Sequence, residues 1–144
     1  MKILVYCLII CGLLIGCNTS GKAIQKNDSS LNLSQQDTVR IANDDLEYEI
    51  IIIDPGFSFW LASTARPEGY YSQQFMESRN WQYVNEWNNR VLQPHRYSTN
   101  LYEMQIDYQP GIDYGYEVNY KLYNYFIYFQ ITYKQQLAGF IPRI

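Results

Sequence analysis

The chain has 144 residues, of which 47% are hydrophobic, 17% charged and 17% aromatic, and its formal net charge is −3 with a pI near 5.0. This length allows one domain, or two at most, and the composition is ordinary for a folded protein. The negative charge argues against a nucleic-acid-binding protein, which needs a basic face to release counterions from phosphates. A single histidine excludes any metal site built from two or three imidazoles.

Residues 1–16 have the features of a secretory signal peptide. Lys2 supplies a positive charge, and an uninterrupted apolar run follows it from Ile3 to Ile15. A helix of this length spans roughly 20 Å, which is short of the ~30 Å hydrocarbon core of a bilayer. The run therefore predicts a cleaved signal peptide and not a transmembrane anchor.

The signal ends in Leu14-Ile15-Gly16-Cys17, which resembles the lipobox of bacterial lipoproteins. The resemblance implies a diacylglyceryl thioether on Cys17, cleavage before this residue and acylation of the new amino group. Such chains would hold the mature protein stably on a lipid bilayer. Asn18 follows the cysteine, and by the sorting rule of enterobacterial lipoproteins this implies the periplasmic face of the outer membrane. The alternative is an ordinary signal peptide or an uncleaved anchor with a chance cysteine.

Residues 17–37 comprise the predicted lipidated cysteine and a polar tether without aromatic residues, whose root-mean-square reach is roughly 25 Å. Removal of the signal leaves no cysteine in 38–144, which excludes disulfides and thiol chemistry there. All the aromatic residues except Tyr6 lie in 38–144. This segment is long enough to form a core without cross-links, so we expect one Tyr-rich globular domain.

The domain begins with a predicted β-hairpin. Residues 38–42 and 46–53 are rich in β-forming side chains, and the second run ends in four consecutive isoleucines. Asn43-Asp44-Asp45 between them is typical of a turn, and Asp54-Pro55-Gly56 ends the second strand.

Apolar residues at helical spacing predict a short helix over 57–64 and a longer helix that Ser72 caps and Pro94 ends. On the longer helix Glu86 and Arg90 fall on the predicted outer face. Its predicted inner face carries five residues, with Trp87 at the edge: Trp81, Val84, Asn88, Val91 and Leu92.

Alternating apolar and polar residues predict a half-buried strand over 101–108. The segment 113–136 is ambiguous, because its composition favours strands whereas its length without an internal Gly or Pro favours a helix. We expect the helix. It would carry a second apolar stripe, and would therefore be buried on both sides or expose an aromatic surface. The stripe consists of Tyr116, Tyr120, Tyr123, Ile127 and Ile131.

The apolar tail 138–144 is expected to pack as a last short strand. Together these elements predict an α+β fold, a small single domain of two to four antiparallel strands packed with two or three helices. Four segments, 52–57, 65–72, 86–94 and 119–126, resemble a family of short bacterial lipoproteins known as a domain of unknown function. The resemblance covers about 38–144 and implies no activity and no functional residues.

The sequence contains no complete catalytic set. His95 follows a helix in a loop, which is typical of a surface residue, and neither a nucleophile elbow nor a glycine-rich phosphate loop is present. Carboxylates at 44–49 could serve glycoside hydrolysis or Ca²⁺ binding, but turn and strand-face positions are typical of solvated residues. No metal or cofactor is predicted.

Candidate binding residues are polar or tyrosine side chains embedded among aromatics. Glu86 and Arg90 are four residues apart, which suits a helix-surface ion pair, and Arg66 could pair with Asp54. The candidates are Asp54, Arg66, Tyr70, Glu86, Arg90, Tyr116, Tyr120 and Tyr123.

Two functions fit these observations. The first is a non-catalytic binding or assembly module of the cell envelope, anchored through Cys17, whose partner is an envelope protein. The second is a glycan-binding module or a weak carboxylate-dependent hydrolase that acts on envelope polysaccharide. Aromatic side chains provide contact area for sugars, and paired carboxylates can cleave glycosidic bonds.

Overall fold

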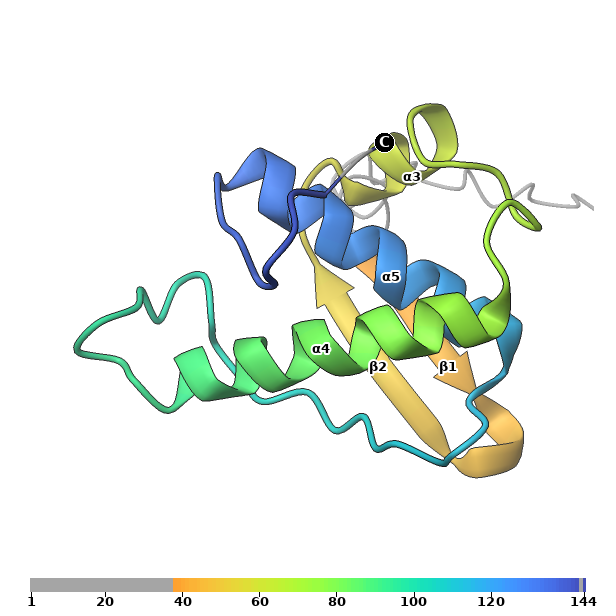
Figure 1. Ribbon diagram of the computed structural model, residues 1–144, viewed down its shortest axis with the longest axis horizontal. Helices are drawn as coiled ribbons and strands as arrows, with labels where there is room; N and C mark the ends of the chain where they lie inside the picture. The colour runs from red at the N-terminus through yellow and green to blue at the C-terminus, as the bar shows by residue number, and fades with distance from the viewer. Residues whose placement is uncertain (1–37, 143) are drawn as a thin grey trace, which may run out of the picture.

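A computed structural model describes residues 38–142 and 144. The predicted signal peptide, Cys17 and the tether lie outside the described residues. The fold is α+β, as predicted, with two antiparallel strands and three α-helices (Figure 1). Within the described part of the chain, no helix combines the length and the hydropathy needed to cross a membrane.

The predicted hairpin is confirmed. Strand β1 (Thr38–Asn43) pairs antiparallel with β2 (Tyr48–Ile53), and the first residue of each strand lies opposite the last residue of the other. The Asn43 side chain accepts hydrogen bonds from the amides of the 3₁₀ turn η1 (Asp44–Leu46). Glu47 adopts a left-handed conformation (φ 51°) to close the turn, and β2 therefore begins two residues later than predicted.

The three helices are α3 (Phe57–Ser63), α4 (Gln73–Val91) and α5 (Gly115–Thr132). The Ser72 Oγ accepts a hydrogen bond from the amide of Phe75 at 3.2 Å, which confirms the predicted cap of α4. Helix α5 confirms the helical interpretation of 113–136.

Helix α5 is the centre of the molecule. It lies between the hairpin and α4 (Figure 1), and eleven of its 18 residues are buried. Tyr120, Tyr123 and Ile127 of the second stripe are buried, and Tyr116 and Ile131 are partly buried. The helix is therefore buried on both sides, and the stripe is core and not an aromatic surface.

The predicted inner face of α4 is wrong by about a quarter turn. Trp81 and Leu92 are 38% and 68% exposed, whereas Trp87 and Arg90 are buried. The buried stripe includes Asn80 and Arg90. The Asn80 Nδ2 and the Arg90 guanidinium donate to groups inside the protein, whereas Asn80 Oδ1 has no partner among the described residues. A hydropathy pattern assigns such residues to the surface, and the face was misplaced for that reason.

The predicted strand over 101–108 is wrong: the segment has no regular secondary structure. Its backbone is bound by side chains of α4. Trp87 Nε1 donates to the Met104 carbonyl at 2.9 Å, and the Asn88 side chain makes two bonds of 2.8 Å to the amide and carbonyl of Ile106. These backbone N–H and C=O groups, which a β-sheet would have used, are therefore already hydrogen-bonded to side chains of α4.

The predicted last strand is also wrong, since 138–142 contains no strand. The tail nevertheless packs on α4, as its apolar composition requires. Phe140 lies against Tyr83, with ring centroids 5.8 Å apart, and under the guanidinium of Arg79 at 3.9 Å.

Candidate functional site

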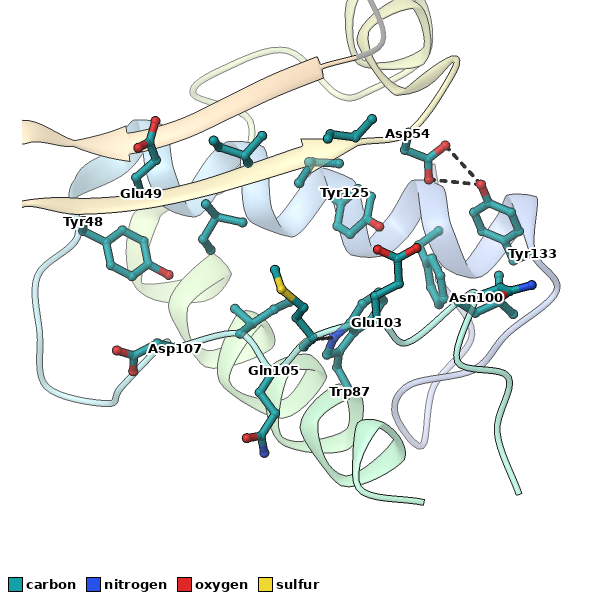
Figure 2. Close-up of a pocket in the computed structure, with 18 of the residues that line it drawn as sticks. Tyr48, Glu49, Asp54, Trp87, Asn100, Glu103, Gln105, Asp107, Tyr125 and Tyr133 are labelled. Carbon is teal, nitrogen blue, oxygen red and sulfur yellow. Dashed lines mark hydrogen bonds between the residues drawn. The ribbon is translucent and has the colours of Figure 1, made fainter. Parts of the chain in front are cut away.

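A groove of about 730 Å³ lies between β2 and the irregular segment 100–107 (Figure 2). One wall is the unbroken run 47–55, which includes all of β2, and the opposite wall comes from 100–107. We call this the β2 groove. Its volume is within the range of ligand sites in proteins.

Aromatic side chains from the helices form the floor of the β2 groove. Trp87 comes from α4, Tyr125 and Phe129 come from α5, and Tyr133 follows α5. The Trp87 and Phe129 rings meet edge to face with centroids 4.9 Å apart. Such packing fixes the rings, so the floor is a rigid apolar surface.

Carboxylates line the groove, and none of its described lining residues is Lys, Arg or His. Glu49 is neutralised by Arg40, whose Nε lies 2.5 Å from its Oε1. The other carboxylates form no ion pair with a described residue, and the groove therefore carries a negative potential. These carboxylates are Glu47, Asp54, Glu103 and Asp107.

Asp54 lies at the end of β2 and is only 6% exposed. The Tyr128 hydroxyl donates to its Oδ1 at 3.0 Å, and the Tyr133 hydroxyl lies 3.1 Å from both carboxylate oxygens. Burial raises the pKa of Asp54 and outweighs the two hydrogen bonds, which lower it. Asp54 forms no bond with Arg66, whose guanidinium bonds instead to the Ile144 carbonyl, so the pair that the sequence left possible is not formed.

Gly56 allows the backbone to turn directly after Asp54 and Pro55. Its φ of 98° is favourable only for glycine, and a Cβ there would lie 3.3 Å from the Tyr128 hydroxyl. That hydroxyl also donates to the Pro55 carbonyl at 2.9 Å. A residue with a side chain at 56 would therefore disturb the contacts that hold Asp54 at the end of the groove.

The raised pKa of Asp54 predicts a pH dependence of stability. When the pH falls through that pKa, the folded state takes up a proton before the unfolded state does, so the wild type gains stability relative to Asp54→Asn. The gain is complete below the unfolded pKa of about 3.9. Urea titrations of both proteins from pH 7 to pH 4 measure it.

Tyr133→Phe provides the second variant for this test. It removes a hydrogen bond that lowers the pKa of Asp54, so the gain on acidification should begin at a higher pH. A difference between wild type and Asp54→Asn that stays constant from pH 7 to pH 4 would contradict the assignment.

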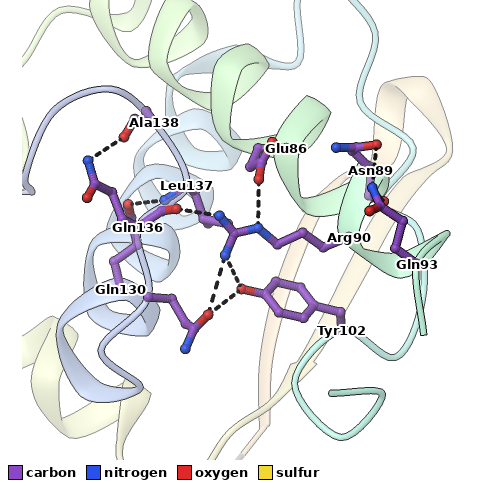
Figure 3. A network of polar contacts seen from close by, with 10 residues as sticks. Glu86, Asn89, Arg90, Gln93, Tyr102, Gln130, Gln136, Leu137 and Ala138 are labelled. Atoms are coloured by element: carbon purple, nitrogen blue, oxygen red, sulfur yellow. Dashed lines mark hydrogen bonds and ion pairs between the residues drawn. The ribbon is translucent and has the colours of Figure 1, made fainter. Parts of the chain in front are cut away.

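Glu86 and Arg90 do pair, but not on the surface as predicted. Arg90 is buried, and its guanidinium is surrounded by acceptors from α4 and from both segments that follow the helices (Figure 3). It donates to Glu86 Oε1 (2.7 Å), the Tyr102 hydroxyl (2.8 Å), Gln135 Oε1 (3.3 Å) and the Gln136 carbonyl (2.5 Å). With its donors so used, Arg90 joins α4 to the segments that follow α4 and α5.

Four other candidates meet where the loop after α3 packs on α5. Tyr120 donates from its hydroxyl to the Arg66 carbonyl at 2.8 Å, and Tyr116 accepts from the Gly69 amide at 2.5 Å. The Arg66 guanidinium lies over the Tyr70 ring at 5.0 Å and donates to the carbonyl of Ile144 at 3.0 Å. These residues hold the loop and the chain end in place.

The remaining candidate, Tyr123, is buried against the rings of Tyr71 and Phe75. No hydrogen bond or ion pair of the described chain joins Tyr123 or the loop contacts to Asp54 or Arg90. The Tyr71 carbonyl also accepts from the Tyr116 hydroxyl, so Tyr123 adjoins the loop contacts. The structure thus divides the predicted candidates into three separate places, and only Asp54 lies on the β2 groove.

Four residues of the groove are not predicted from the sequence as parts of one site: Trp87, Tyr125, Glu103 and Tyr133. One available signal was the alternation at 101–107, which correctly placed Glu103 on an exposed face. Among the residues placed by the structure, no three of His, Cys, Asp and Glu are arranged to hold a metal ion.

Comparison with known proteins gives a family and no function. No curated protein and no solved structure matches the chain. A family model described as a family of unknown function (DUF6146) matches residues 5–141, which is nearly the whole sequence. The chain therefore belongs to the DUF6146 family of unknown function.

Proposed function

We propose that this protein is a lipid-anchored, non-catalytic binding module of the cell envelope, with the β2 groove as its binding site. The observation that carries the proposal is the groove itself, which joins a rigid aromatic floor to a rim of carboxylates without basic lining residues. A few polar groups around an apolar pocket are typical of ligand sites.

Site-specific photo-crosslinking in native membranes tests the groove. A photoreactive amino acid at Met104, which lines the groove and is 74% exposed, should give a discrete adduct. The same amino acid at Leu92, which is also exposed but lies outside the groove, is the matched control. Adducts of equal yield at both positions, or none at either, would count against the groove as the site.

The anchor has its own test. The lipobox resemblance implies acyl chains on Cys17, and Asn18 after the cysteine implies the periplasmic face of the outer membrane. In cells grown with labelled palmitate, Cys17→Ser should abolish both the label and the membrane association, whereas Cys11→Ser should keep both. Fractionation of the two membranes then measures the localisation, and label retained by Cys17→Ser would contradict the anchor.

One observation favours the alternative, a glycan-binding module or a weak hydrolase. The groove contains aromatic rings and two carboxylates, Asp54 and the exposed Glu103. Burial raises the pKa of Asp54. A glycoside hydrolase needs one carboxyl with a raised pKa and a second carboxylate. Release of sugars from purified peptidoglycan that Asp54→Asn abolishes would support this function. Unchanged peptidoglycan would remove the hydrolase.

A further inference from the structure

The second edge of β2 has no strand partner in the described chain. In an antiparallel pair, alternate residues bond to the neighbouring strand, so the others direct their N–H and C=O groups to the opposite edge. For β2 that edge is the wall of the groove. The facing segment does not satisfy it, because the backbone groups of Met104 and Ile106 bond to α4.

The shape of the groove fits an extended chain. Nine consecutive residues, 47–55, form one wall, and the opposite segment follows them over the same length (Figure 2). A strand rises about 3.3 Å per residue, so the six residues of β2 offer an edge of roughly 20 Å. A compact ligand would use only part of this length.

The charges of the groove select a basic occupant. Glu47, Glu103 and Asp107 are exposed on its two walls and have no ion pair with a described residue. A second copy of the chain would bring the same carboxylates against them, which disfavours self-association through this edge. The groove therefore complements a segment rich in Lys or Arg.

One unsatisfied polar group also lies on the groove. The Tyr48 hydroxyl is buried and has no hydrogen-bond partner among the described residues. Figure 2 shows it directed into the groove, at the same end as Asp107. A buried hydroxyl left without a partner is costly, and a peptide in the groove could pair with it only after the side chains that cover it had moved.

We propose that the β2 groove binds an extended peptide segment that alternates basic and apolar residues and adds to β2 as a third strand. The inference rests on the proposed function and names the chemistry of its partner. Main-chain bonds to β2 would provide affinity, as in other cases of strand addition. Alternate apolar side chains would pack on the floor, where Tyr125 and Tyr133 are partly exposed, and the basic ones would meet the carboxylates.

Blocked octapeptides titrated into the full-length protein in nonionic detergent test this proposal. A Lys-Val alternating peptide should bind, and a Glu-Val peptide should bind at least tenfold more weakly. Two N-methylated versions of the Lys-Val peptide, methylated at every lysine or at every valine, test the main-chain bonds. One of them should lose at least tenfold in affinity more than the other, because only one edge of the peptide can face β2.

Charge reversal at the rim completes the test. Glu103→Lys together with Asp107→Lys should weaken Lys-Val binding at least tenfold, and Glu68→Lys, an exposed glutamate outside the groove, should not. If both N-methylated peptides bind like the parent, strand addition is wrong. If no peptide binds while Met104 still crosslinks in membranes, this inference fails and the proposed function stands.

Discussion

Replacement of Arg90 by alanine should lower the free energy of unfolding by about 3 to 4 kcal/mol, which is the loss typical of removing one partner from a buried ion pair. The guanidinium has four acceptors, and three of them lie outside α4: the Tyr102 hydroxyl, the Gln135 side chain and the Gln136 carbonyl. Without Arg90 these groups would be left short of donors.

Two further arginine variants serve as comparisons for Arg90→Ala. Arg90→Lys keeps the charge but loses the planar fork that reaches several acceptors at once, so its loss should be intermediate. Arg96→Ala, at an exposed arginine beside Tyr97, should leave the stability nearly unchanged. Urea titrations followed by circular dichroism measure all three proteins. A loss below about 1 kcal/mol for Arg90→Ala would show that the network is solvated and not buried.

The helices and the hairpin could be predicted because their signals are local. Ser72 caps α4 through its own side chain, and the polar turn after Asn43 separates two β-rich runs. The long run between Gly115 and Gly139 contains no residue that breaks a helix. Since each of these signals acts within a few residues, no knowledge of the tertiary structure was needed.

The strand over 101–108 failed because tertiary contacts decided it. Its alternation is partly kept, with Tyr102 and Tyr108 buried and Glu103 and Asp107 exposed. A strand also needs a partner for its backbone, however, and here Asn88 and other α4 groups bind that backbone first. The polarity pattern of a sequence contains no information about that competition.

The candidate site was predictable only at Asp54. A carboxylate directly after a β-rich run is visible in the sequence, whereas a groove is not. The β2 groove exists because 100–107 is held to α4 and does not pair with β2. The same failure of the predicted strand thus produced both the groove and the free edge. The burial of Arg90 was not predicted, since its charge suggested a surface position.

Replacement of Asn119 by alanine is the second change with a large expected effect, a loss of about 2 to 4 kcal/mol in the free energy of unfolding. Asn119 is fully buried on α5 and joins three parts of the fold. Its Oδ1 accepts from the Tyr108 hydroxyl at 2.7 Å and from Asn80 Nδ2 at 3.1 Å, and its Nδ2 donates to the Gly115 carbonyl at 2.9 Å. Alanine removes all three bonds.

Changes at the hydrogen-bond partners of Asn119 should show how much of this loss in the free energy of unfolding each bond contributes. Tyr108→Phe should cost about 1 kcal/mol, because it removes one hydrogen bond and leaves an acceptor that Asn80 still satisfies. Asn80→Ala combined with Asn119→Ala should cost about 0.5 to 1 kcal/mol less than the sum of the single changes, because both single changes remove the same side-chain bond between Asn80 and Asn119. Asn85→Ala, on the exposed face of α4, is the control and should leave stability nearly unchanged. Strictly additive losses would mean that the side-chain bond between Asn80 and Asn119 contributes nothing to stability.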